Sequence, residues 1–205
     1  MAVITISRQF GAGGETLGRM IADELNYTFV DSSILQMIAK EANVSPNFVK
    51  LVEEESGTKL AKVISKMVSK RWLDCILAGE CGYIDEKIYI DYLVLIVAQI
   101  ADEGNAVIMG RGSQYILSDH PDAYHILLIN EFENRVKFLM DHHNLSNKRA
   151  IKAVNTEDKR RANLYSKLGK KDYDDPSNYQ LVLNMDCISL ESAFKQVCLT
   201  IKQQS

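Results

Sequence analysis

The sequence predicts an α/β fold of three layers, in which a parallel sheet of about five strands lies between two layers of helices. Strand-like and helical patterns alternate along most of the 205 residues. Several strand-like runs are continuously apolar, which is typical of parallel strands buried on both faces. The first of them, residues 3–6, is followed by a glycine cluster and then by a helical pattern. Nucleotide-binding α/β units begin in this order.

Two short strands and one helix are predicted before residue 32. After the strand at 3–6 and the glycine cluster, apolar residues recur at spacings of three and four, which predicts a helix. They are Leu17, Met20, Ile21 and Leu25. Residues 28–30 form a second apolar run that ends at Asp31, where a further helix can start.

Residues 43–90 carry a helical pattern that no strand interrupts. Apolar residues lie on one face of it and lysines on the other. The apolar ones are Leu60, Val63, Ile64, Met67, Val68 and Trp72. A helix at about 89–102 follows and is apolar nearly all round, as buried helices are. We interpret residues 43–99 as a helical insertion beside the sheet.

The second half of the chain continues the alternation. Further strands are predicted at 106–109, 125–129 and 179–183, where the sequence is continuously apolar or nearly so. Helices are predicted at about 132–140 and 190–201 from apolar residues at helical spacing.

We expect one domain with three parts. The core comprises residues 1–42, 100–142 and 179–205. The insertion comprises residues 43–99, and a polar, charged segment at 143–178 forms a lid.

A phosphate cradle is predicted between the first strand and the first helix. It needs converging backbone N–H groups, glycines that let the backbone close around an anion, and a helix N-terminus behind them. Four small residues supply these, namely Gly11, Ala12, Gly13 and Gly14. Next to them, Glu15 would crowd a triphosphate unless Mg²⁺ or an arginine screens it, and Thr16 either binds a phosphate oxygen or caps the helix. The alternative is a glycine turn that only joins the strand to the helix.

The consensus G-x-x-x-x-G-K-[ST] is met only in part. If Gly13 takes the place of the last consensus glycine, Gly14 stands where the lysine belongs and Arg8 where the first glycine belongs. The positive charge of the lysine must then come from Arg8, Arg19 or a distant arginine.

Six segments occur in an order that points to one family. They are ITISRQFGAGG, FVD, AVIMGRG, NRVKFLMD, DKRRANLY and NYQLVLN. This order resembles the cytidylate-kinase-like family, a branch of the P-loop nucleoside monophosphate kinases, over about residues 3–30 and 100–200. The resemblance implies a P-loop NTPase-like fold with a nucleotide-binding insertion and a mobile lid. It also implies transfer of the γ-phosphate of ATP, with Mg²⁺, to a nucleoside monophosphate, CMP or dCMP first. The loop lysine of bacterial cytidylate kinases is absent here.

Arg111 is the first candidate for a phosphate-binding side chain. Phosphoryl transfer needs positive charge around the transferring group, and the planar fork of arginine binds phosphate oxygens bidentately. Arg111 follows the strand predicted at 106–109, at the edge of the sheet where ligands bind. The resemblance implies that Arg111 holds the phosphate of the acceptor. The alternative is a surface arginine in a loop.

The predicted lid is strongly basic. Residues 148–171 hold nine of the 24 basic residues of the chain and two acidic ones, Glu157 and Asp158. Such a segment can close over phosphates and exclude water. The resemblance implies that Arg161, and next Arg160, stabilise charge in the transition state. The alternative is a solvated helix face, with the two acidic residues at the start of the helix.

Two further substrate-binding candidates stand near these arginines in the sequence pattern. Arg135, on the helix before the lid, either faces the lid or pairs with Glu131. Asp31 ends the second strand, and its carboxylate either orients the acceptor or a Mg²⁺-bound water, or caps a helix starting at Ser32. An acidic cluster before Pro176 is better interpreted as a turn than as a calcium loop. It comprises Asp172, Asp174 and Asp175.

Composition limits the classes of function. A net charge of −3 argues against a generally basic nucleic-acid binder. The longest apolar run, residues 92–98, is far shorter than the ~20 residues of a membrane span, and the first ten residues do not resemble a signal peptide. Four cysteines without a CxxC pair predict reduced thiols in a cytoplasmic protein, and no metal site is expected from protein ligands.

Two alternatives to a nucleoside monophosphate kinase stay open. One is a sensor that binds a nucleotide without turnover, because the loop lysine is missing. The other is a kinase for a different small acceptor, because the insertion resembles cytidylate kinases least. The apolar helices of that insertion are also a candidate surface for a homodimer.

Overall fold

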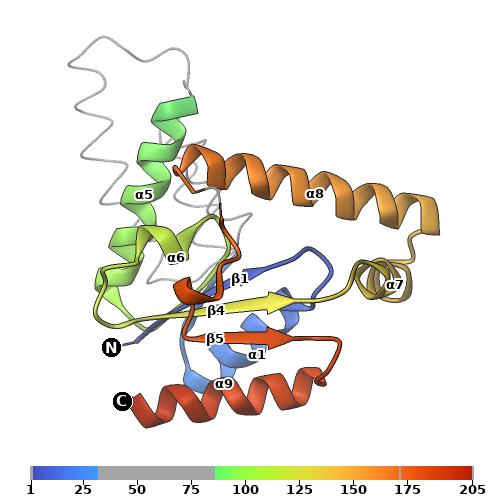
Figure 1. Ribbon diagram of the computed structural model, residues 1–205. Helices are drawn as coiled ribbons and strands as arrows, with labels where there is room; N and C mark the ends of the chain where they lie inside the picture. Colours follow the sequence, from blue (N-terminus) through green and yellow to red (C-terminus); the bar gives the residue numbers. More distant parts are fainter. Residues whose placement is uncertain (1, 32–85, 171, 205) are drawn as a thin grey trace, which may run out of the picture.

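The computed structural model describes residues 2–31, 86–170 and 172–204, and five strands of this part form one sheet (Figure 1). Neighbouring strands are all parallel, in the order β2-β3-β1-β4-β5. The strands are β1 (Val3–Arg8), β2 (Thr28–Val30), β3 (Ala106–Met109), β4 (Ala123–Ile129) and β5 (Leu181–Asn184). The described helices are α1 (Gly14–Leu25), α5 (Glu86–Glu103), α6 (Ser113–Ile116), α7 (Phe132–His143), α8 (Asn147–Lys167), η1 (Pro176–Asn178) and α9 (Leu190–Gln204). The predicted parallel α/β sheet is confirmed.

β1 lies in the middle of the sheet and is longer than its apolar run. It pairs with β3 from Val3 to Ile6 and with β4 as far as Arg8. The two polar residues Ser7 and Arg8 therefore continue the strand beyond the apolar run, which the hydrophobic pattern alone does not reveal. As a result, the Arg8 side chain starts from the carboxyl edge of the sheet.

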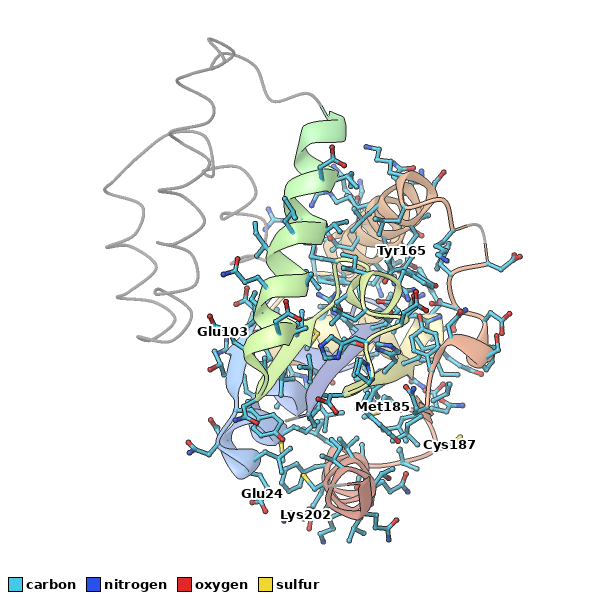
Figure 2. The ribbon with its side chains drawn as sticks, turned by 90° about the vertical axis from the view of Figure 1, so that its left-hand side faces the viewer. Glu24, Glu103, Tyr165, Met185, Cys187 and Lys202 are labelled. Carbon is cyan, nitrogen blue, oxygen red and sulfur yellow. The ribbon has the colours of Figure 1, made fainter. Side chains whose placement is uncertain are left out.

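One face of the sheet is covered by α1 and α9 (Figure 1). Ile6, Met109 and Ile126 of the strands form a buried cluster with Leu17 of α1 and Val197 of α9. Burying a side chain of this size contributes about 1.5–3 kcal/mol. At the far ends of the two helices, the Lys202 ammonium donates to the Glu24 carboxylate at 3.0 Å, and Figure 2 shows the two residues together.

The opposite face is covered by α5, α6 and α8 and changes character along β1. Near the amino end of the strand, Val3 packs with apolar residues of α5 such as Leu93 and Val97. Farther along, the face carries Thr5 and Ser7, which are fully buried and polar. This face of the sheet is therefore apolar near the amino end of β1 and polar near its carboxyl end, where the candidate site lies.

α7 and α8 form a helical pair beside the sheet, joined by a short connection after His143 (Figure 1). Val136 and Leu139 of α7 pack against Ala150 and Val154 of α8. α8 lies within the segment predicted as the lid. Glu157 stands in the middle of α8, so the expectation that Glu157 and Asp158 lie at the start of a helix is wrong.

The division into core, insertion and lid stays a prediction. Most of residues 43–99 lies outside the described residues, and so do Trp72 and the surface predicted for a homodimer. α5, which starts at Glu86, packs on the sheet. None of the described helices combines the length and the apolar character that a membrane crossing requires.

Candidate functional site

The glycine loop, residues 9–13, joins β1 to α1 and requires glycine at position 11. Gly11 has a φ of +89°, and a Cβ there would lie 2.9 Å from the backbone oxygen of Arg135 in α7, so only glycine fits. The Leu17 N–H donates to the Gly13 carbonyl at 3.1 Å and closes the first turn of α1. The N–H groups before Leu17 have no acceptor within the helix and project from its positive end.

The residues that follow the loop do not obstruct it. The Glu15 carboxylate accepts from the Arg19 guanidinium at 3.1 Å, and both side chains are exposed on the surface of α1. This pair screens the charge of Glu15. Thr16 is exposed in the first turn, and the N-cap of α1 is Gly13, which has no side chain to cap the helix.

Arg8 reaches from the end of β1 across the start of α1. The aliphatic part of its side chain lies against Gly14, where a Cβ would be 2.9 Å from Cγ of Arg8. Its guanidinium lies against Gly110, at the end of β3, where Nη1 would overlap an added Cβ. Arg8 therefore connects the glycine loop with the turn that follows β3.

That turn holds Arg111 in an unusual backbone conformation. Gly110, Arg111 and Gly112 have φ values of +66°, +56° and +72°. For a residue other than glycine this conformation costs about 1–2 kcal/mol. The Gly110 N–H donates to the Ile6 carbonyl at 2.9 Å, and Leu168 packs so closely on Gly112 that a Cβ would not fit. The surroundings thus force Arg111 into this conformation at the carboxyl edge of the sheet.

Arg161 comes to the same edge from α8. Its guanidinium donates to Ser7 Oγ at 2.9 Å and to the Asp174 carboxylate at 2.8 Å, and 12% of the side chain is exposed. It also lies over the rings of Tyr165 and Tyr173, at 5.0 and 5.2 Å from their centroids. Burial lowers the pKa of Arg161, but the hydrogen bonds to Asp174 more than offset this, so its pKa lies above the usual value. Arg161 is fixed and charged.

Arg8, Arg111 and Arg161 form what we call the arginine cluster. Burial lowers the pKa of the Arg8 guanidinium, and the charges of Arg161 and Arg111 lower it further, whereas Tyr165 and Glu157 raise it. Arginine nonetheless stays protonated at neutral pH. Mutual repulsion of the three charges is relieved when an anion binds among them. The cluster and the glycine loop together present guanidinium and backbone N–H donors that suit an anion of several charges.

The structure does not bring every candidate into this cluster. Arg160 is 72% exposed at its side chain and pairs with Glu157 at 2.5 Å. Arg135 is buried and pairs with Asp158 of α8 at 2.9 Å, so it faces the predicted lid.

Asp31 lies at the carboxyl end of β2, 3.8 Å from the Arg19 guanidinium, and its side chain is 20% exposed. The helix predicted to start at Ser32, which Asp31 could cap, falls on residues outside the described ones. The interpretation of the acidic cluster as a turn fits the structure, since Asp175 accepts from the Ser177 N–H and opens η1.

A polar network beneath Arg161 escaped the sequence analysis. The Ser7 and Tyr165 hydroxyls lie 3.1 Å apart, and Gln114 donates to the Tyr179 hydroxyl at 3.2 Å. Tyr165 stands four residues after Arg161, a spacing that places both on one face of a helix and could have paired them. No comparable signal marks Asp174, because it approaches Arg161 only through the fold.

The donor set fits nucleotide phosphates. Guanidinium groups and backbone N–H groups both favour phosphate oxygens. Among the described residues, no group of three or more His, Cys, Asp or Glu side chains could hold a metal ion. Mg²⁺ that accompanies a nucleotide is usually held by phosphate oxygens, waters and one or two protein oxygens, and the hydroxyl of Thr16, exposed in the first turn of α1, would be one such oxygen. When bound, Mg²⁺ supplies charge neutralisation of the phosphates.

Solved structures resemble this fold. An uncharacterized protein from Eubacterium ventriosum aligns with a TM-score of 0.69 at 16% identity, covering 98% of this chain and 99% of that one. A gluconokinase from Sinorhizobium meliloti has a TM-score of 0.53 at 11% identity, with 99% and 93% covered. A shikimate kinase from Bacteroides thetaiotaomicron has a TM-score of 0.51 at 15% identity, with 98% of each chain covered. These likenesses show the P-loop kinase fold, as predicted.

Sequence comparison gives a family as well. No curated protein matches the chain. The model of the cytidylate kinase-like family matches residues 3–187, which include the glycine loop, the turn at Arg111 and all of α8. The match extends over most of the chain, and the protein therefore belongs to the cytidylate kinase-like family.

Proposed function

We propose that the protein transfers the γ-phosphoryl group of ATP to a nucleoside monophosphate, with CMP or dCMP as the first acceptor to test. The observation that carries this proposal is the arginine cluster, which surrounds the carboxyl end of β1 beside the glycine loop. Membership of the cytidylate kinase-like family supports it.

Each part of the site has a role in this proposal. The backbone N–H groups between Gly11 and Thr16 bind the phosphates of the donor, except that of Ala12, which donates to the Gln9 carbonyl at 3.1 Å. Arg111 holds the phosphate of the acceptor. Arg161, fixed by Ser7 and Asp174, stabilises negative charge on the transferring group. A bond forms between an acceptor phosphate oxygen and the γ-phosphorus, the bond from that phosphorus to the bridging oxygen breaks, and ADP leaves.

Three candidates have secondary roles. Asp31 lies at the same edge of the sheet and orients the acceptor. Arg135 holds α8 in place through Asp158 and contacts substrate only if that pair opens. Arg160 joins the cluster only if α8 turns or closes, since its side chain faces solvent in this structure.

A kinase with a different small acceptor is the second candidate. Two of the similar structures are a gluconokinase and a shikimate kinase, so the same fold serves other acceptors. Most of the insertion, which is the part of the chain that resembles cytidylate kinases least, lies outside the described residues.

Release of ADP from ATP and Mg²⁺ tests the proposal. CMP, dCMP, UMP, AMP, GMP, shikimate and gluconate are each offered as acceptor, and ATP binding is measured by calorimetry in parallel. We expect stimulation by a nucleoside monophosphate, with CMP or dCMP strongest. Stimulation by shikimate or gluconate alone favours the second candidate. Tight ATP binding without stimulation by any acceptor contradicts the proposal and favours a sensor.

A further inference from the structure

The glycine loop departs from the phosphate-loop consensus at two positions. Gly14 stands in the place of the lysine, and Arg8 stands in the place of the first glycine. In the sequence these departures are separate, and each alone weakens the consensus. In the structure the two positions are in contact.

The contact leaves no room for a side chain at position 14. A Cβ at Gly14 would lie 2.9 Å from Cγ, 3.2 Å from Cβ and 3.4 Å from Cδ of Arg8. An approach of 2.9 Å between carbon atoms is well inside their optimal separation of about 3.5–4.0 Å. The aliphatic part of Arg8 therefore occupies the space in which the side chain of a lysine at position 14 would begin.

The charged end of Arg8 also arrives at the edge where the phosphates are expected. Its guanidinium lies against Gly110 and is within electrostatic range of Arg111 and Arg161. Gly110 leaves the space that the guanidinium fills, because an added Cβ would overlap Nη1. The position of this charge thus depends on two glycines, because Gly14 contacts the aliphatic part of Arg8 and Gly110 contacts its guanidinium.

We propose that Arg8 performs the task of the missing lysine, binding the β- and γ-phosphates of the donor from the opposite end of the loop. This inference rests on the proposed function only in taking a nucleoside triphosphate as the ligand. An arginine offers a planar fork with two parallel N–H donors, whereas a lysine offers a single charged point. Arg8, from β1, then binds the phosphates of the donor, while Arg111 holds the phosphate of the acceptor and Arg161, from α8, stabilises the transferring group.

A purely structural role for Arg8 makes a different prediction. In that case its stem would join the loop to the turn after β3, and its charge would not matter. Arg8→Met keeps a stem of similar length and removes the charge. Arg8→Gly/Gly14→Lys moves the charge back to the consensus position and removes the stem that would obstruct it.

The experiment measures binding of ATP, ADP, AMP and inorganic triphosphate by calorimetry, with Mg²⁺ present. The variants are Arg8→Met, Gly14→Lys and Arg8→Gly/Gly14→Lys. Lys202→Met is the matched control, because it removes one positive charge at the end of α9, beside Glu24 at the far end of α1 (Figure 2). Thermal melting confirms that each variant is folded.

We expect Arg8→Met to weaken the binding of ATP, ADP and inorganic triphosphate by about 10- to 100-fold, which is the range for losing a charged hydrogen-bond donor. AMP, which has no β-phosphate, changes little. Gly14→Lys binds ATP weakly because Arg8 obstructs its side chain, and the double variant binds ATP at least about tenfold more tightly than Gly14→Lys. Lys202→Met binds all ligands as the unmodified protein does.

Three results overturn the inference. The first is unchanged ATP affinity in folded Arg8→Met. The second is equal weakening of ATP and AMP, which indicates a general disturbance of the site. The third is a folded double variant no better than Gly14→Lys. If the unmodified protein binds none of the ligands, this inference and the proposed function both fail. Binding of ATP that depends on Arg8, without transfer to any acceptor, supports the inference and contradicts only the proposed function.

Discussion

Replacing Arg111 by alanine and by glycine separates the work of its side chain from the strain of its backbone. Both variants remove the guanidinium and all its contacts. They differ in one respect, because glycine adopts the observed φ of +56° without strain and alanine does not. If Arg111 is a functional residue held in a strained conformation, both variants should be inactive. The glycine variant should then be more stable than the alanine variant.

The magnitude follows from the conformation. The left-handed region destabilises a residue with a Cβ by about 1–2 kcal/mol. The greater freedom of glycine in the unfolded chain lowers the stability of the glycine variant by about 0.4–1 kcal/mol, which offsets part of this gain. Arg111→Gly should thus exceed Arg111→Ala in free energy of unfolding by roughly 0.5–1 kcal/mol. For a chain of this size that difference raises Tm by about 1–4 °C. Loss of the guanidinium should lower kcat/KM for the acceptor at least about 100-fold in both variants.

Urea unfolding and calorimetric melting measure the stability difference, and acceptor-dependent release of ADP measures the activity. Equal stability of the two variants would refute the assignment of strain to Arg111. Activity near that of the unmodified protein in either variant would remove Arg111 from the site. Retained ATP affinity in both variants shows that the loss concerns the acceptor and not the donor.

Three further predictions concern the supports of the site. Gly11→Ala should lower the free energy of unfolding by about 1–3 kcal/mol, because φ is +89° and the new Cβ meets the backbone oxygen of Arg135; unchanged urea unfolding contradicts this. Asp174→Asn should lower the free energy of unfolding by about 1–2 kcal/mol, a range already reduced for the partial exposure of Asp174, because Arg161 loses its counter-charge. Unchanged stability in urea would show that the pair does not hold Arg161. Burial lowers the pKa of His125, so the stability that its neutral form contributes is present above about pH 6.5 and is lost as pH falls. Urea unfolding at pH 7.5 and 5.5 should show a smaller loss in His125→Gln, and an equal loss contradicts the assignment.

The central strands β1, β3 and β4 could be predicted because they are almost wholly buried on both faces. β2 and β3 occupy the ranges that their apolar runs predict, residues 28–30 and 106–109. The carboxyl end of β1 could not be delimited in this way, since Ser7 and Arg8 are polar and their pairing with β4 depends on the sheet. The glycine loop could be predicted from the glycines between the first strand and the first helix, because its conformation requires glycine at fixed positions.

The side-chain arrangement of the site was harder to predict. Adjacent residues of a helix point about 100° apart, so Arg160 and Arg161 cannot share one face. The buried residues Ala150, Val154 and Tyr165 mark the face of α8 that contains Arg161, and this period was available in the sequence. The contact between positions 8 and 14 was not, because it forms only when the loop closes.

Transfer of a labelled γ-phosphate from ATP to CMP tests the central claim most directly. The labelled product is separated after incubation with Mg²⁺, and Arg111→Ala serves as the inactive control. The account predicts label in CDP that appears with the protein and disappears in the variant. Tight ATP binding without labelled product from CMP or any other nucleoside monophosphate would contradict it.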